Sequence, residues 1–69
     1  MKFAVVIERA QENYSAYVPD LPGCISTGQT LDEVERNIRE AIVFHIDGLR
    51  EDGQTNPEAT THVAEVEIA

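Results

Sequence analysis

The side chains best suited to catalysis are carboxylates spread along the chain. Two-metal nuclease chemistry needs several carboxylates that converge on the ions. The available ones are Asp20, Asp32, Glu33 and Asp47. Asp32 and Glu33 have a local role at a helix start, and Asp47 belongs to a solvated helix face. We therefore expect no catalytic residues, and we predict that the protein is not an enzyme.

The two histidines and the single cysteine favour structural roles. His45 lies on an apolar helical stripe, where a partly buried histidine is the simpler interpretation than a catalytic base. His62 begins a predicted strand, and the two histidines are not spaced like a ligand pair. Cys24 is interpreted as a small buried hydrophobe, with a reactive thiol beside a helix start as the alternative. We expect no metal and no cofactor.

The elements that position these residues begin with a predicted hairpin. Phe3 to Ile7 is a continuous apolar run, which is typical of a strand buried on both faces. Tyr14 to Val18 alternates between apolar and polar residues and predicts a second, antiparallel strand. Pro19 ends this strand because its nitrogen has no hydrogen to donate.

A tight corner and a third strand follow. Asp20-Leu21-Pro22-Gly23 predicts a type II turn, in which Gly23 takes a positive φ. Cys24 to Thr27 predicts a short strand that Gly28 breaks. The turn has two interpretations: a rigid connector, or a rigid loop that presents Asp20 and Leu21 to a partner with little loss of entropy.

A long helix comes next, with marked ends. Thr30 and Glu33 form a capping box at its start, and Gly53 predicts its C-cap. A helix of about 20 residues spans roughly 30 Å, whereas strands of about five to seven residues span roughly 20 Å. One helix end must therefore extend past the sheet, and its apolar surface calls for a partner. That surface includes Val43, Phe44 and Ile46.

The last segments complete an α+β domain. Residues 54–61 predict a loop, and His62 to Ile68 alternates so that Ala64, Val66 and Ile68 point inward, with Glu65 and Glu67 outward. The predicted order is β-β-β-α-β, a two-layer sandwich with one long helix on a mostly antiparallel sheet. We expect residues 1–69 to form a single domain.

Length and charge limit the partners. A 69-residue domain has a thin core, and one cysteine excludes an internal disulfide, so self-association as a dimer or tetramer is the expected source of stability. The net charge of −8 disfavours direct binding of nucleic acid and suits a basic protein or simple solubility. No stretch approaches the length of a membrane span or a signal peptide, so we expect a cytoplasmic protein.

The stretch from Tyr14 to Glu33, YSAYVPDLPGCISTGQTLDE, resembles the HicB-like antitoxin superfamily, as does NIREAI from Asn37 to Ile42. The resemblance covers Met1 to about Gly53 well and the last strand more loosely. It implies a β-β-β-α-β sandwich described as a partly degraded ribonuclease H-like fold. It also implies a partner: HicA, a small, typically basic RNA-cleaving toxin that carries a functional histidine.

The resemblance has one departure and leaves three hypotheses. Members usually carry a C-terminal DNA-binding domain, whereas this chain ends at Ala69; we expect none here, which puts operator binding in doubt. The first hypothesis is a module that neutralises a HicA-like toxin, and the second is a stand-alone oligomeric domain with a regulatory or structural role. A metal-dependent nuclease is the third. The candidate interface residues are Asp20, Leu21, Phe44 and Ile46.

Overall fold

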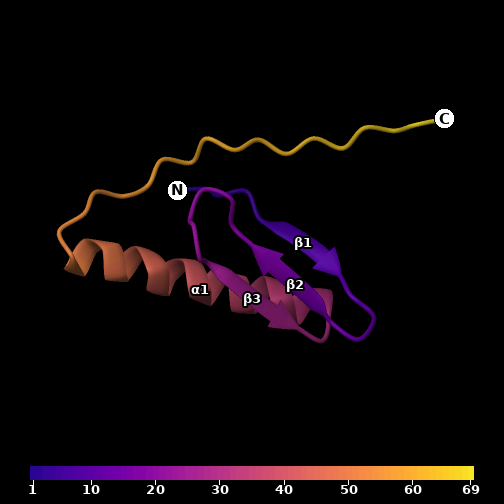
Figure 1. Ribbon diagram of the computed structural model, residues 1–69, viewed down its shortest axis with the longest axis horizontal. Coiled ribbons are helices and arrows are strands. Elements are labelled where there is room, and N and C mark those ends of the chain that lie inside the picture. The colour runs from indigo at the N-terminus through magenta and orange to yellow at the C-terminus, as the bar shows by residue number, and fades with distance from the viewer.

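The computed structural model describes residues 1–69 as three strands followed by one helix (Figure 1). The strands β1 (Val6–Arg9), β2 (Tyr14–Tyr17) and β3 (Ile25–Gly28) form an antiparallel sheet in the order β1-β2-β3. The helix α1 (Leu31–Glu51) covers one face of this sheet. The α+β class and the order β-β-β-α are as the sequence predicts. No helix combines the length and the apolar character that a membrane crossing requires.

The first strand begins later than predicted, at Val6 instead of Phe3. In the observed register Val6 faces Tyr17, the last residue of β2. Residues before Val6 therefore run past the end of β2, and the next residue, Val18, bonds on the β3 side through its backbone N–H to the carbonyl of Cys24. The apolar run was a correct sign of burial, since Phe3 and Val5 pack against the core, but it could not show where the partner strand ends.

The corner between β2 and β3 consists of two successive turns. The backbone N–H of Leu21 donates to the carbonyl of Val18 at 3.0 Å, and that of Cys24 donates to Leu21 at 3.0 Å. Gly23 has a φ of +85°, which confirms the predicted positive φ in the second turn. The geometry turns the Leu21 side chain inward, where it is 1% exposed and is among the largest fully buried side chains.

The helix has the predicted start, and it ends at Glu51 with Asp52 as its C-cap, one residue before the predicted Gly53. The Thr30 hydroxyl oxygen accepts a hydrogen bond from the Glu33 backbone N–H at 3.1 Å, and the Glu33 carboxylate accepts one from Gln29 at 3.3 Å. The first bond satisfies a donor that the first turn leaves free, and the second satisfies the N–H of the residue before the N-cap. At the other end Gly53 takes a φ of +76°, and the Gln54 N–H bonds back to the carbonyl of Leu49.

The core lies between the sheet, the corner and the first half of α1. Six buried residues form it: Ala16, Val18, Leu21, Cys24, Val34 and Ile38. Gly28 does not break β3 as predicted; it is the last strand residue and is buried. A Cβ built at Gly28 would lie 2.5 Å from the backbone nitrogen of Val34. Gly28 therefore allows α1 to approach the sheet closely.

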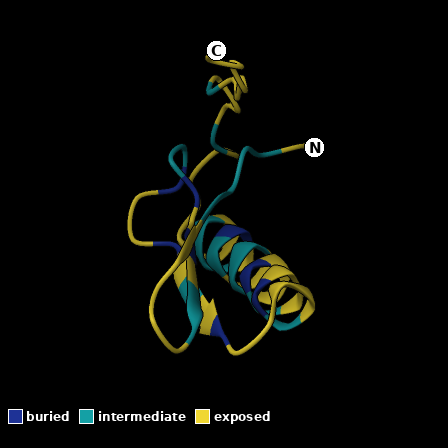
Figure 2. Ribbon diagram, turned by 90° about the vertical axis from the view of Figure 1, so that its right-hand side faces the viewer, coloured by how far each residue is buried: buried dark blue, intermediate teal, exposed yellow.

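The predicted fifth element is absent from the isolated chain. Residues 62–68 are extended but form no strand, and every one of them is exposed. Figures 1 and 2 show this segment leaving the body on the side where the N-terminus lies. A strand requires a neighbour for its backbone hydrogen bonds, and this segment has none within its own chain. The predicted β-β-β-α-β order is thus observed only as β-β-β-α.

Candidate protein-binding site

Asp20 ties the corner of the sheet to the C-terminal part of the chain. Its carboxylate accepts hydrogen bonds from the backbone N–H groups of Thr60 and Thr61, at 3.1 and 3.0 Å. The hydroxyl groups of the same two threonines donate to it at 3.2 and 2.7 Å. We call this arrangement the Asp20 clamp. It fixes the chain at Thr61, immediately before the extended segment 62–68.

The clamp favours the charged form of the carboxylate. The hydrogen bonds from Thr61, first the backbone N–H and then the hydroxyl, lower the pKa of Asp20, and those from Thr60 add to this. Desolvation opposes them, with an influence smaller than either Thr61 bond and larger than either Thr60 bond. The sequence shows no sign of this contact, because it joins residues 40 positions apart.

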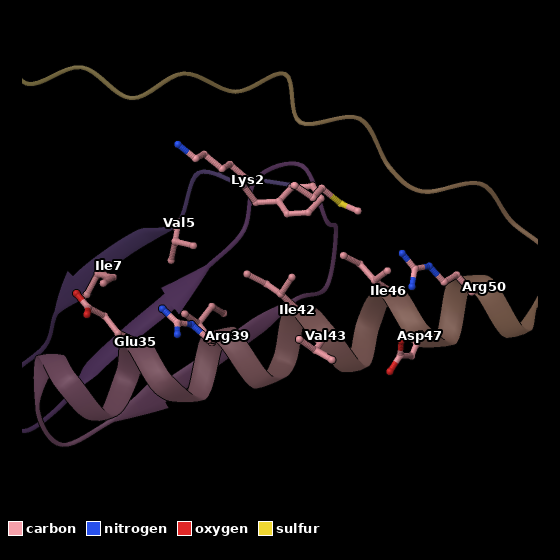
Figure 3. A pocket seen from close by; sticks show the side chains of 13 residues that line it. Lys2, Val5, Ile7, Glu35, Arg39, Ile42, Val43, Ile46, Asp47 and Arg50 are labelled. Atoms are coloured by element: carbon pink, nitrogen blue, oxygen red, sulfur yellow. The ribbon is translucent and has the colours of Figure 1, made fainter.

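An apolar groove lies between the N-terminal segment and α1 (Figure 3). It encloses about 780 Å³. Val5 and Ile7 line it from the strand side, and Ile42 and Ile46 line it from the helix. Its charged side chains are Lys2, Glu35, Arg39, Asp47 and Arg50. Three of the five cations of the chain thus border this groove.

The outer surface of the helix carries a single exposed aromatic ring. Phe44 is 83% exposed. Glu40 and Asp47 stand four residues before it and three after it, so both lie next to it on the helix surface, and both are exposed. Gly48, four residues after Phe44, has open space around it. Phe44 is therefore an apolar group in an acidic, uncrowded surface.

The helix overhang predicted from the sequence is present. With 21 residues α1 spans about 32 Å, whereas four-residue strands span about 13 Å. Figure 1 shows the C-terminal half of α1 extending past the strands. Val43 and Phe44 are exposed there, while Ile46 is buried beside the groove.

The four predicted interface residues lie in different environments. Leu21 is in the core, and Asp20 is engaged by the clamp. Ile46 borders the groove, and Phe44 lies on the outer helix surface. The sequence indicated Phe44 and Ile46, because the predicted helix extends past the sheet. It gave no indication that the N-terminal segment would form the other wall of the groove.

The residues considered for catalysis do not converge. No three side chains among the histidines, cysteine and carboxylates lie together as a metal site would require. His45 is half-buried beside the corner, and His62 is exposed on the extended segment. Cys24 is a buried free thiol, and burial raises its pKa, which disfavours the reactive thiolate.

Comparison with known proteins identifies related chains. The family model described as HicB-like antitoxin of bacterial toxin-antitoxin system matches residues 3–68. An uncharacterised 14.9 kDa protein of Haemophilus phage HP1 is 44% identical over 59 residues, which are 86% of this chain and 44% of the phage protein. The chain thus spans less than half of that relative.

Two solved structures share the fold. The N-terminal domain of the Burkholderia pseudomallei antitoxin HicB has a TM-score of 0.75 and 37% identity, over 88% of this chain and 73% of that one. A chain of the HicA3 and HicB3 toxin-antitoxin complex has a TM-score of 0.73 and 28% identity, over 87% of this chain and 70% of that one.

Proposed function

Because the chain belongs to the HicB-like antitoxin family, we propose that it is a non-catalytic, protein-binding module that neutralises a small basic toxin of the HicA type. The observation that carries the proposal is the family match over residues 3–68, supported by the likeness to a chain of the HicA3 and HicB3 complex. The proposal includes a cytoplasmic location, which a free, buried Cys24 favours.

The surface around Phe44 is the proposed toxin contact. Exposed aromatic side chains are frequent anchors of protein interfaces, because they bury a large area with few rotatable bonds. Glu40 and Asp47 flank the ring, so a basic partner would meet opposite charge around an apolar centre. The net charge of −8 adds long-range attraction to such a partner and accelerates its association.

A co-purification experiment tests the function. The neighbouring genes are first searched for one that encodes a short basic protein; the chain is then co-expressed with that product, and complex formation and rescue of growth are measured. We expect a stable complex and relief of growth arrest. No complex at micromolar concentration, together with continued growth arrest, would contradict the antitoxin function.

A pair of alanine variants tests the surface. Phe44→Ala should weaken toxin binding by about 30-fold, the effect of an interface residue worth about 2 kcal/mol. Ile25→Ala is the matched control, because Ile25 is also an exposed apolar side chain but lies in β3 on the sheet. If Ile25→Ala weakens binding and Phe44→Ala does not, toxin binding stands but uses the sheet.

We also propose that the domain self-associates, which is the second candidate role if no toxin exists. The apolar groove and the exposed segment 62–68 favour it, because a small soluble chain seldom exposes several large apolar side chains without a partner. Light scattering after size-exclusion chromatography at micromolar concentration tests it. A mass equal to one 7.7 kDa chain would contradict it.

A further inference from the structure

We propose that residues 62–68 of each chain form a strand on the open edge of β1 in a second copy, so that a symmetric dimer exchanges its C-terminal segments. The inference rests on the proposed self-association and specifies the surfaces that produce it. The proposed toxin contact is a different surface, centred on Phe44 on the outer side of α1, and Asp47 borders both surfaces.

The donor is a segment with every feature of a strand except a partner. None of the 33 backbone-to-backbone hydrogen bonds involves a residue beyond Gln54. Val63, Val66 and Ile68 are 66, 76 and 83% exposed. An extended segment with free N–H and C=O groups and alternating apolar side chains is a template for pairing with another strand.

The recipient is the outer edge of β1, beside the apolar groove. In the sheet order β1-β2-β3, β1 pairs with β2 only, so its other edge is open. The groove borders this edge and is lined by apolar side chains from the N-terminal segment and α1 (Figure 3). A strand added there would extend the sheet and cover the groove at the same time.

The side-chain pattern of the donor fits one orientation. Because successive residues of a strand point to opposite faces, Ala64, Val66 and Ile68 would lie together on one face. Turned toward the helix, these three would cover Ile42 and Ile46 in the groove. The opposite face would then place Glu65 and Glu67 in water, at no desolvation cost.

Charge also favours this pairing. Lys2, Arg39 and Arg50 outnumber the two carboxylates at the groove, so the groove is locally positive in a chain of net charge −8. The segment from residue 58 to 69 contains three glutamates and no Lys or Arg. An acidic strand would therefore be attracted to this groove more than to any acidic part of the surface.

The Asp20 clamp explains why the recipient is a second copy. It fixes the chain at Thr61, so a return to its own sheet would have to begin directly after the clamp. Residues 62–69 contain no Gly, Pro, Asn or Asp, the residues that favour turns. The chain instead extends outward: its radius of gyration is 13.4 Å, whereas a compact chain of this length has about 11 Å.

Two matched variants test the exchange. Val66→Glu places a charge on the face that enters the groove and should weaken dimerisation by about 100-fold, because a buried, unpaired carboxylate is costly. Val63→Glu makes the same change on the opposite face and should leave the dimer intact. Both positions are exposed in the isolated chain, so both variants should fold, which circular dichroism checks. Light scattering gives the mass.

Each outcome of this test has a separate meaning. A wild-type monomer at micromolar concentration would overturn both the exchange and the proposed self-association. If the wild type and Val66→Glu are both dimers, self-association stands and the exchange is wrong. If Val63→Glu is a monomer as well, the sensitivity is not confined to one face, and the proposed orientation is wrong.

Disulfide trapping separates exchange from folding back. A chain with Val66→Cys is mixed with an isotope-labelled, untagged chain that carries Val43→Cys at the groove, and the mixture is oxidised and analysed by mass. We expect a covalent heterodimer that a reducing agent separates. The wild type is the control, since its only thiol, Cys24, is buried. If a chain with both substitutions instead closes an internal disulfide and remains monomeric, the segment covers its own groove and the proposal fails.

Discussion

At the residue scale, the Asp20 carboxylate accepts more hydrogen bonds than any other side chain in the molecule. Two backbone N–H groups and two hydroxyls converge on its carboxylate, and they hold Thr60 and Thr61 to the corner of the sheet. The clamp therefore decides where the segment 62–68 starts. Its strength depends on the charge of one side chain.

The clamp should open in acid. Its hydrogen bonds lower the pKa of Asp20, so the stabilisation is complete above the ordinary carboxyl pKa of about 3.9. It is lost as the pH falls through the lower pKa of the folded state, where the carboxylate gains a proton. We expect the amide resonances of Thr60 and Thr61 to titrate together below about pH 4 in nuclear magnetic resonance spectra.

A pair of neutralising variants supplies the control for the pH effect. Asp20→Asn removes the titrating charge and should abolish the joint titration of the two threonine amides. Asp47→Asn makes the same chemical change on the exposed helix surface and should leave the titration unchanged. A joint titration that persists in Asp20→Asn would show that another group controls the clamp.

At the scale of elements, α1 approaches the end of β3 closely at Gly28. Two glycines make this contact testable. A methyl group at Gly28 would overlap the backbone of Val34, which cannot move without shifting the helix. A methyl group at Gly48, within the same helix, meets open space.

The two glycine variants should change stability in opposite directions. Gly28→Ala should lower the free energy of unfolding by about 1–3 kcal/mol through overpacking. Gly48→Ala should raise it by up to about 1 kcal/mol, because alanine is the better helix former. Urea denaturation measures both. Equal stability of Gly28→Ala and the wild type would mean that the helix can move away from the sheet at little cost.

The ends of the helix and strands show which parts of the fold could be predicted from the sequence. The helix ends were predictable from Thr30, Glu33 and Gly53, because caps and the positive φ of glycine depend on neighbouring residues. The corner at Gly23 was predictable for the same reason. The start of β1 was not, because it depends on where β2 ends, and Phe3 and Val5 are packed apolar residues whether or not they pair.

The candidate site was less predictable than the fold. The overhang of α1 followed from comparing lengths, so the sequence indicated Phe44. The groove has Lys2 on one wall and Arg39 on the other, and no local pattern joins positions so far apart. The alternation of residues 62–68 predicts a strand, which the isolated chain does not form. The alternation of apolar and polar residues does not show whether a partner strand belongs to the same chain.

At the scale of the whole molecule, the shape favours association of two copies, whereas the net charge opposes it. The chain measures 47 × 27 × 16 Å, so a large share of its residues lies at the surface and little is buried. Two copies with a net charge of −8 each repel at long range. A dimer therefore depends on local contacts that overcome this repulsion, including the attraction of the acidic segment 58–69 to the locally positive groove.

Stability should depend on protein concentration. If the exchanged segments complete the sheet, folding and association are coupled, and each tenfold rise in concentration stabilises the dimer by about 1.4 kcal/mol. We expect the wild-type midpoint of thermal unfolding to rise with concentration, and that of Val66→Glu to remain constant. A wild-type midpoint independent of concentration would contradict the coupling.

The position of Met1 and Lys2 in the wall of the groove has a practical consequence. Both chain ends meet there in the proposed dimer, because the C-terminal segment would fill the groove that the N-terminal residues help to build. An affinity tag fused to either end would then compete with the exchanged strand 62–68 or block the groove that this strand occupies. Recombinant material should be prepared with a cleavable tag and compared before and after cleavage, since an uncut fusion would report a molecule with a different assembly.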